Sequence, residues 1–225
     1  MPNLLRLSAL AIICTLALFI QACGTLNGTV PFKYVPSLAS GETINLRAGL
    51  QTLADERPED DRSATESIAD VPDKVTAKLI EDFRASQVFA TLDFPIQQDK
   101  DDLILQGAIK RFYWKMKPSP ITFIPVINLV LYFGVPARYV DGIASLCLRV
   151  IRAKTGQTLA EYEKSSTRTE NYTLYSFKAG EAGAELAEAF RDVVKQIKDA
   201  ITTDGKVGRF VVASTSEGRF VGRGN

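Results

Sequence analysis

The segment from Leu103 to Trp114 carries the strongest structural signal in the chain. Leu103, Leu105, Gly107 and Ile109 alternate with Gln106, Lys110 and Phe112, which we assign to the opposite face. A period of two is typical of a β-strand with one buried face. Similar patterns predict four further strands, and a Lys154-Thr155-Gly156 turn joins the last two into a hairpin. These strands are expected at 44–50, 88–94, 143–151 and 158–169.

Two other segments repeat apolar residues at helical spacing. We expect one helix to begin at an Asp70 N-cap, with Pro72 in its first turn, and to end near Ser86. The second runs from Ala182 to Ile201 and ends at Gly205, with its wet face formed by Glu185, Glu188, Arg191, Lys195 and Lys198.

The order of these elements predicts the fold class. It reads β, α, β, β, an apolar insertion at 118–139, then β, β, α. We therefore expect a single α+β domain over 41–204, with a mainly antiparallel or mixed sheet of four to five strands and two amphipathic helices on one face. The acidic stretch from Asp55 to Arg62 is expected to be a solvated loop in which Asp55 and Arg57 pair or cap the strand end. The last residues, 205–225, are interpreted as an edge strand or a loose tail.

The N-terminal residues indicate export. After the single charge of Arg6, the stretch from Leu7 to Ala22 is uncharged and falls short of the ~20 residues that a spanning helix needs. Residues 1–22 are thus predicted to be a signal peptide; an uncleaved anchor is the alternative. Ile20-Gln21-Ala22-Cys23 resembles the lipobox of bacterial lipoproteins, which implies acylation of Cys23, palmitate included, and a linker over 23–40. Gly24 in place of aspartate implies an outer-membrane destination.

Composition excludes several classes of function. Lys and Arg number 27 against 26 Asp and Glu, so no basic excess indicates nucleic acid. The chain has no histidine, which removes the commonest general base and nearly all zinc sites. Cys147 alone remains once Cys14 leaves and Cys23 is acylated, so no disulfide is expected, and Cys147 is interpreted as a small core residue.

No catalytic or cofactor motif stands out. The chain lacks a nucleophile elbow, a phosphate loop and a dinucleotide fingerprint. Glu161 and Glu163 alternate with Tyr162 as solvent-facing residues do, and the acidic stretch from Asp55 to Asp61 lacks the pattern of a calcium loop. We expect no metal, no cofactor and no enzymatic activity.

The uncharged stretch from Ile121 to Val135 is the main candidate for a contact surface. Three interpretations stay open: a buried crossover, a loop that meets a partner or a twin subunit, and a loop that dips into lipid with Trp114, Tyr132 and Tyr139 at the headgroups and the lysines on phosphates. The residues expected to make the contact are Phe123, Ile124, Ile127, Leu129, Leu131, Tyr132 and Phe133, together with Trp114, Lys115, Lys117 and Arg138.

Several stretches together resemble a known group. They are the lipobox, "LADERP", "FRASQVFATLDF" and "DDLILQGAIKRFYW". The chain resembles small outer-membrane lipoproteins of the YajG kind and the broader group with a TolB-amino-terminal-like fold, which includes lipoprotein activators of penicillin-binding proteins. In that group an Asp-x-Arg segment follows the first strand, here Asp55 and Arg57, and a strand like that from Asp102 to Ile109 follows the helix. The likeness covers about 44–201; the stretch from Ile121 to Val135 departs from it.

The resemblance implies a non-catalytic protein held by its Cys23 lipid at the periplasmic face of the outer membrane. The group shares no catalytic residues to transfer. The expected role is to bind another envelope component, such as a transport or secretion assembly, a cell-wall synthase, or lipid in transit. The alternatives are an envelope enzyme acting on glycan or lipid, and a structural homo-oligomer built through 121–135.

Overall fold

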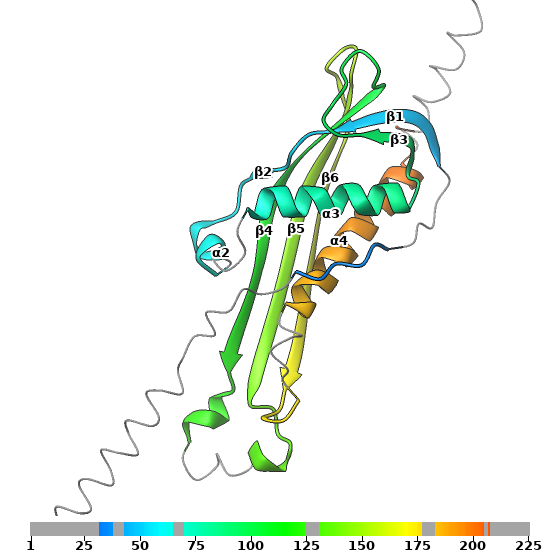
Figure 1. The fold of residues 1–225 in the computed structure, drawn as a ribbon. Helices are drawn as coiled ribbons and strands as arrows, with labels where there is room; N and C mark the ends of the chain where they lie inside the picture. Colours follow the sequence, from blue (N-terminus) through cyan, green and yellow to red (C-terminus); the bar gives the residue numbers. More distant parts are fainter. Residues whose placement is uncertain are drawn as a thin grey trace, which may run out of the picture.

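The computed structural model describes residues 32–37, 43–64, 70–124, 131–176, 183–204 and 207. It shows the expected mixed α+β fold (Figure 1). The predicted signal peptide, Cys23, Ile127, Leu129 and all of 205–225 except Val207 lie outside the described residues. The elements are β1 (Ile44–Leu50), β2 (Ala54–Asp55), α2 (Glu59–Ala64), α3 (Val71–Ala85), β3 (Phe89–Asp93), β4 (Leu103–Pro118), η1 (Pro120–Phe123), β5 (Arg138–Arg152), β6 (Thr158–Tyr172) and α4 (Ala184–Thr203).

The sheet is mixed and has six strands in the described part of the chain. Its order is β3-β1-β4-β5-β6, and the two-residue β2, which lies in the predicted acidic loop, pairs with β4. β1 runs parallel to both β3 and β4, whereas β4, β5 and β6 are antiparallel. The pairing of β4 with β5 continues to Pro118 and Arg138, past the expected strand ends. These three strands therefore form a long ribbon (Figure 1).

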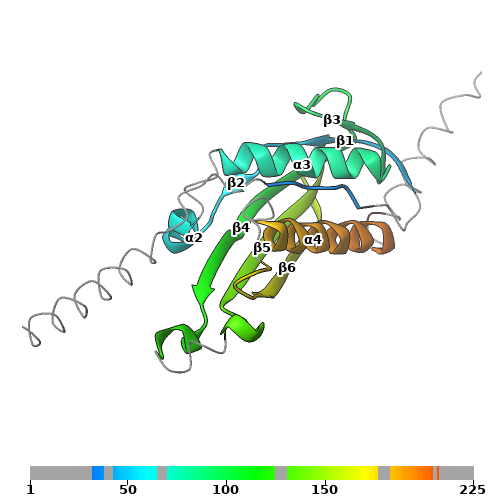
Figure 2. The same ribbon diagram turned by 60° about the horizontal axis from the view of Figure 1, so that its bottom comes forward.

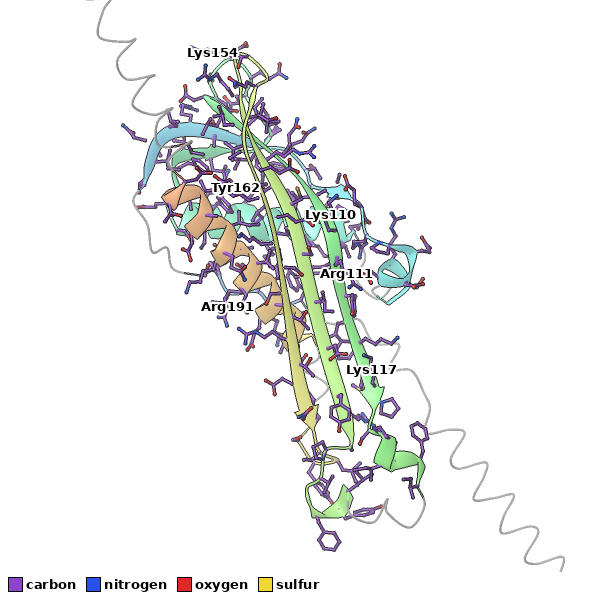
Figure 3. All side chains as sticks on the ribbon, turned by 180° about the vertical axis from the view of Figure 1, so that it is seen from behind. Lys110, Arg111, Lys117, Lys154, Tyr162 and Arg191 are labelled. Carbon is purple, nitrogen blue, oxygen red and sulfur yellow. The ribbon has the colours of Figure 1, made fainter. Side chains whose placement is uncertain are left out.

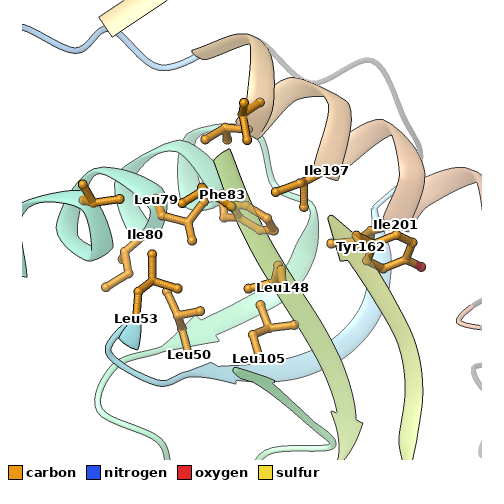
Figure 4. Packing of buried hydrophobic residues seen from close by; sticks show 14 of the residues in the cluster. Leu50, Leu53, Leu79, Ile80, Phe83, Leu105, Leu148, Tyr162, Ile197 and Ile201 are labelled. Carbon is orange, nitrogen blue, oxygen red and sulfur yellow. The ribbon is translucent and has the colours of Figure 1, made fainter. Parts of the chain in front are cut away.

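Helices α3 and α4 lie on one face of the sheet, as predicted (Figure 2). Their apolar stripes meet the sheet in one core, where Leu79 and Phe83 of α3 and Ile197 of α4 lie near Leu105 and Leu148 (Figure 4). Asp70 is the N-cap of α3, as predicted, but its backbone is left-handed, with φ of 54°, and its side chain makes no cap hydrogen bond. Pro72 lies in the first turn as predicted.

A β-bulge in β4 changes which side chains reach the core. The pairing register with β5 shifts between Ile109 and Arg111, so that Lys110 is the extra residue. An extra residue reverses the alternation beyond it. Phe112, predicted on the face opposite Ile109, consequently lies on the core side with 1% of its surface exposed.

Two glycines are required by the backbone. A side chain at Gly142 would collide with the backbone of Glu185 and Leu186, so this glycine lets the start of α4 lie directly on β5. Gly156 has φ of 69° in the turn between β5 and β6, where the sequence predicted it. The hairpin of β5 and β6 is confirmed.

The acidic stretch is partly helical, contrary to the prediction of a loop. Helix α2 places acidic side chains in its first turn, where the helix dipole favours them. Asp61 is buried, and both of its carboxylate oxygens accept hydrogen bonds from Arg111, at 3.0 and 3.1 Å. Asp55 and Arg57 form the expected pair through two hydrogen bonds of 2.8 and 2.9 Å.

Residues 32–37, which we name the N-terminal strap, pack between α3 and α4 (Figure 2). The Phe32 ring lies 5.2 Å from that of Phe112 and 5.6 Å from that of Phe190, and Tyr34 is 5.0 Å from Phe190. A linker was predicted over these residues. The strap differs from a linker because its aromatic rings are part of the core.

A buried ion pair joins the strap to both helices. Lys198 of α4 contacts Asp82 of α3, and their side chains are 3% and 0% exposed. The Lys198 ammonium also donates to Ser37 Oγ and Ser86 Oγ, both at 2.6 Å. Asp82 accepts hydrogen bonds from the Tyr34 hydroxyl and from the Ser37 backbone N–H at 2.7 Å. The prediction that Lys198 faces solvent is therefore wrong.

Candidate functional site

The connection between β4 and β5 forms the end of the ribbon. Ser119 N–H donates to the Ala137 carbonyl at 2.8 Å, and Ala137 N–H donates to the Tyr172 carbonyl at 2.8 Å. These bonds place three segments at the same end of the sheet. We call residues 119–124, 131–137 and 173–176 the ribbon tip; it lies opposite the turn that carries Lys154 (Figure 3).

Large apolar side chains are exposed at the ribbon tip. Phe133 is 85% exposed, Phe123 69% and Tyr132 63%, and Ile124 is also exposed. The β6–α4 connection adds Leu174 and Tyr175. In the part of the chain that the structure describes, six of the eight exposed large hydrophobic residues lie here, the others being Val35 and Phe94. The interpretation of 121–135 as a buried crossover is thus wrong for these side chains.

Two buried side chains hold the tip in place. Leu131, which was predicted to be a contact residue, is 2% exposed, and Ala137 is 1% exposed. Backbone hydrogen bonds within residues 119–124 hold that segment of the tip together. Thr122 N–H donates to the Ser119 carbonyl at 2.9 Å, and Ile124 N–H donates to the Ile121 carbonyl at 3.2 Å. Leu131 therefore anchors the tip from within, while its neighbours Tyr132 and Phe133 face outward.

A collar of charges surrounds the strand ends behind the tip. Lys117 pairs with Asp141 at 2.7 Å, and this hydrogen bond raises the pKa of Lys117 and lowers that of Asp141. Lys115 is exposed, and half-buried Arg138 lies 3.7 Å from the Met116 sulfur. The expected flanking cations do lie next to the apolar tip.

Trp114 does not belong to the exposed surface. It is half-buried against the core, and its indole N–H donates to Glu185 Oε2 at 3.0 Å. Glu185 also accepts a hydrogen bond from the Tyr172 hydroxyl and is 2% exposed, so its predicted place on the wet face of α4 is wrong. Tyr139 is half-buried.

Cys147 lies on the sheet face away from the helices, beside a shallow depression of about 240 Å³. It is buried as predicted but does not belong to the main core. Burial, followed by the hydrogen bond to Glu161, raises the pKa of the Cys147 thiol to about 11. A thiol in that state is a poor nucleophile near neutral pH.

The carboxylates near this depression form ion pairs with basic side chains. Glu56 pairs with Lys110, and Glu161 lies 3.1 Å from Arg149. In the described ranges, no group of three or more acidic or cysteine side chains is arranged to hold a metal ion. None of the helices placed by the structure has the length and apolarity to span a membrane.

Comparison with known proteins identifies likenesses in structure only. No protein-family model matches the chain, and no curated protein matches its sequence. A DUF330 protein from Xanthomonas campestris is 12% identical, with 84% of this chain and 97% of that chain covered and a TM-score of 0.41. Uncharacterized lipoprotein B from Nitrosomonas europaea is 13% identical, with coverage of 76% and 90% and a TM-score of 0.42.

A further likeness is to an oligomer. PelC from Paraburkholderia phytofirmans, a dodecamer, is 10% identical, with 75% of this chain and 95% of that chain covered and a TM-score of 0.39. The structural neighbours thus include bacterial lipoproteins, as the sequence resemblance implied, while the specific YajG and TolB-like group is not confirmed. At these scores the likenesses transfer no residue roles to this chain.

The sequence pointed to the tip but missed part of it. Phe123, Ile124, Tyr132 and Phe133 were expected at a contact surface, and the structure brings them to one end. Leu174 and Tyr175 were not expected there; they lie five and six residues after the end of the strand predicted at 158–169. The register of β5 with β6, which pairs Arg138 with Tyr172, is what carries them to the tip.

Proposed function

We propose that this chain is a non-catalytic lipoprotein, anchored by Cys23 at the periplasmic face of the bacterial outer membrane. Its ribbon tip is the surface that contacts another envelope component. The observation that carries the proposal is the gathering of six exposed apolar side chains at that tip. Contiguous apolar patches on a folded monomer usually mark interaction sites.

The position of the patch supports a binding role. The rest of the apolar surface of the ribbon is used in the core under α3 and α4, whereas the tip lies beyond both helices (Figure 1). Its side chains make no large contribution to that core, yet the stretch from Pro118 to Ala137 carries no charge. A purely structural turn at the end of an exposed hairpin needs no such composition, since turns favour small and polar residues.

The alternative of an envelope enzyme has less support. Cys147 has a raised pKa, and the nearby carboxylates are paired with Lys110 and Arg149. A homo-oligomer is a variant of the binding proposal, because a second copy would use the same tip.

The anchor is tested by mass spectrometry of the mature N-terminus combined with membrane fractionation. The wild-type protein is expected to begin at an acylated Cys23 and to enter the outer-membrane fraction. The Cys23→Ala variant is expected to keep its signal peptide and lose the acyl mass. An unmodified wild-type chain that still begins at Met1 would show an ordinary anchor instead and overturn the lipoprotein assignment.

The contact surface is tested by photo-crosslinking in cells. A crosslinking amino acid replaces Phe133 at the tip or, as a matched control, Lys154 at the opposite end of the ribbon (Figure 3). Both positions are exposed. We expect adducts, with either a protein or a lipid of the envelope, from position 133 and few from position 154. Equal yields from the two positions would contradict the assignment of the tip as the contact surface.

A further inference from the structure

We propose that the ribbon tip inserts into the same lipid leaflet that holds the acyl chains of Cys23. The occupant of the tip is thus a phospholipid surface rather than a protein. This inference rests on the lipid anchor of the proposed function and specifies what its contact surface meets.

The length of the tether is the first support. Phe32 is fixed in the core by its contact with Phe112, with ring centroids 5.2 Å apart. Phe32 is the ninth residue after Cys23, and nine residue steps span at most about 30 Å. The core of an anchored protein therefore lies within about one domain diameter of the membrane.

The length of the ribbon matches this reach. Pro118 is the sixth residue of β4 after Phe112, and six residue steps measure about 20 Å at the usual rise of a strand. The start of the tip thus lies about 20 Å from Phe112, which is within the maximum reach of the tether, about 30 Å. An anchored molecule whose ribbon points to the membrane would bring tip and acyl chains to one surface.

The chemistry of the tip suits lipid better than a specific protein. Its exposed side chains include Phe123 and Phe133, and two tyrosines, Tyr132 and Tyr175, which have an apolar ring and a polar end. Aromatic residues of this kind are favoured at the boundary between headgroups and acyl chains. The stretch from Pro118 to Ala137 offers no charge for directional recognition of a protein partner.

The collar predicts how binding depends on headgroup charge. Lys115, Lys117 and Arg138 are positive, but Lys117 is paired with Asp141, and Glu170 lies opposite Val140 in the sheet. The small positive excess would lie at the level of the phosphates. We therefore expect insertion to be driven by the apolar side chains and to be only modestly weakened by salt or by removal of anionic lipid.

The test uses the full lipidated protein in vesicles of phosphatidylethanolamine and phosphatidylglycerol. A cysteine at Phe133→Cys, or at the control Lys154→Cys, carries an environment-sensitive fluorophore. Cys147 is 6% exposed and its thiol has a pKa of about 11, and Cys23 is acylated, so the introduced thiol is the one that labels. Lipids with quenchers in their acyl chains report insertion. We expect strong quenching and a blue shift at position 133 and neither at position 154.

The outcomes separate the two proposals. Equal, weak quenching at both positions of a lipidated protein would overturn insertion and leave the anchor intact. Protein adducts from position 133 without quenching would assign the tip to a protein partner, and adducts between identical chains would assign it to an oligomer; each overturns the inference. An unmodified Cys23 would instead overturn the proposed function. It would also overturn the inference that the tip and the acyl chains of Cys23 enter the same leaflet.

A second variant shows whether the apolar side chains drive insertion. The probe is placed at Tyr132→Cys, with or without the double change Phe123→Ser and Phe133→Ser. Both phenylalanines are exposed, so the fold should tolerate the change. We expect the double change to abolish most of the quenching at position 132. Unchanged quenching would contradict insertion driven by these side chains.

Discussion

Two parts of the β4–β5–β6 ribbon, the part under α3 and α4 and the tip, use apolar residues in opposite ways. Under α3 and α4, Leu105 and Leu148 are each 1% exposed, whereas at the tip Phe133 is 85% exposed. The tip directly continues the same β4–β5 pairing that contains Leu105 and Leu148. Apolar content alone therefore does not say whether a strand end is core or surface. The cover supplied by the helices and the strap decides it.

Glu185 marks the boundary between the covered part of the ribbon and the tip. It lies in the first turn of α4, above Gly142, and accepts hydrogen bonds from Trp114 of β4 and Tyr172 of β6. Beyond this point the strands continue without a helix over them (Figure 2). The comparison predicts that changes on the covered side lower stability, and that changes at the tip lower binding alone.

The largest effect on stability is expected from the ion pair beneath the strap. Lys198→Met leaves the Asp82 carboxylate buried without its cation, which typically costs about 3–5 kcal/mol of unfolding free energy. Urea denaturation measures it. Lys195→Met, an exposed position on the same helix, is the control and should stay within about 0.5 kcal/mol of wild type. Similar midpoints for both variants would show that the covered side does not depend on this pair.

The second-largest effect on stability is expected in the strap, which belongs to the covered side of the comparison. Tyr34→Phe keeps the ring contacts with Phe190 and removes the hydrogen bond to Asp82. Because hydrogen bonds to charged groups contribute about 1.5–3 kcal/mol, a loss in that range is expected from equilibrium unfolding. Tyr175→Phe at the tip is the matched control. If Tyr34→Phe leaves the free energy of unfolding unchanged, the strap packs on the core without stabilising it.

The boundary itself should show a smaller effect. Glu185→Gln keeps the shape and one acceptor oxygen but removes the charge, and we expect a loss of about 1 kcal/mol. Trp114 is the single tryptophan of the chain, so its emission reports the contact directly. We expect a shift in emission in the folded variant. If Glu185→Gln changes neither the Trp114 emission nor the stability, Glu185 does not mark the end of the covered region.

The smallest effect on stability is expected at the tip. Phe133→Ser should leave the unfolding free energy within about 0.5 kcal/mol of wild type, because the side chain has few contacts to lose. Leu131→Ser, two residues away but buried, is the comparison and should be clearly destabilising. A marked loss of stability from Phe133→Ser would show that the tip is part of the core.

Local patterns predicted the elements, and long-range contacts decided most of the errors. The period-two and helical patterns located five strands and two helices because both depend on one buried face. The bulge at Lys110 is invisible in that pattern, so Phe112 was assigned to the wrong face. Glu185 and Lys198 look like solvated charges on a helix; their burial depends on Trp114 and Tyr172, and on Asp82, which are distant in sequence.

The candidate site was predictable only in part for the same reason. The uncharged run around Phe123 and Phe133 identified an unusual segment, but composition is the same for a buried and an exposed loop. The strand register, which extends β4 to Pro118, places that segment beyond the helices. Register also brings Tyr175 there from another loop.

The paired strands behind the tip work as a ruler. Because every residue of β4 from Arg111 to Pro118 has a partner in β5, lengthening both strands by two residues would move the tip outward by about 7 Å and keep every side chain on its present face. A change of one residue in each strand would reverse the faces of the strand residues beyond the insertion. The distance between the core and whatever the tip touches is therefore adjustable in steps, and relatives that serve surfaces at different heights should differ in ribbon length by even numbers.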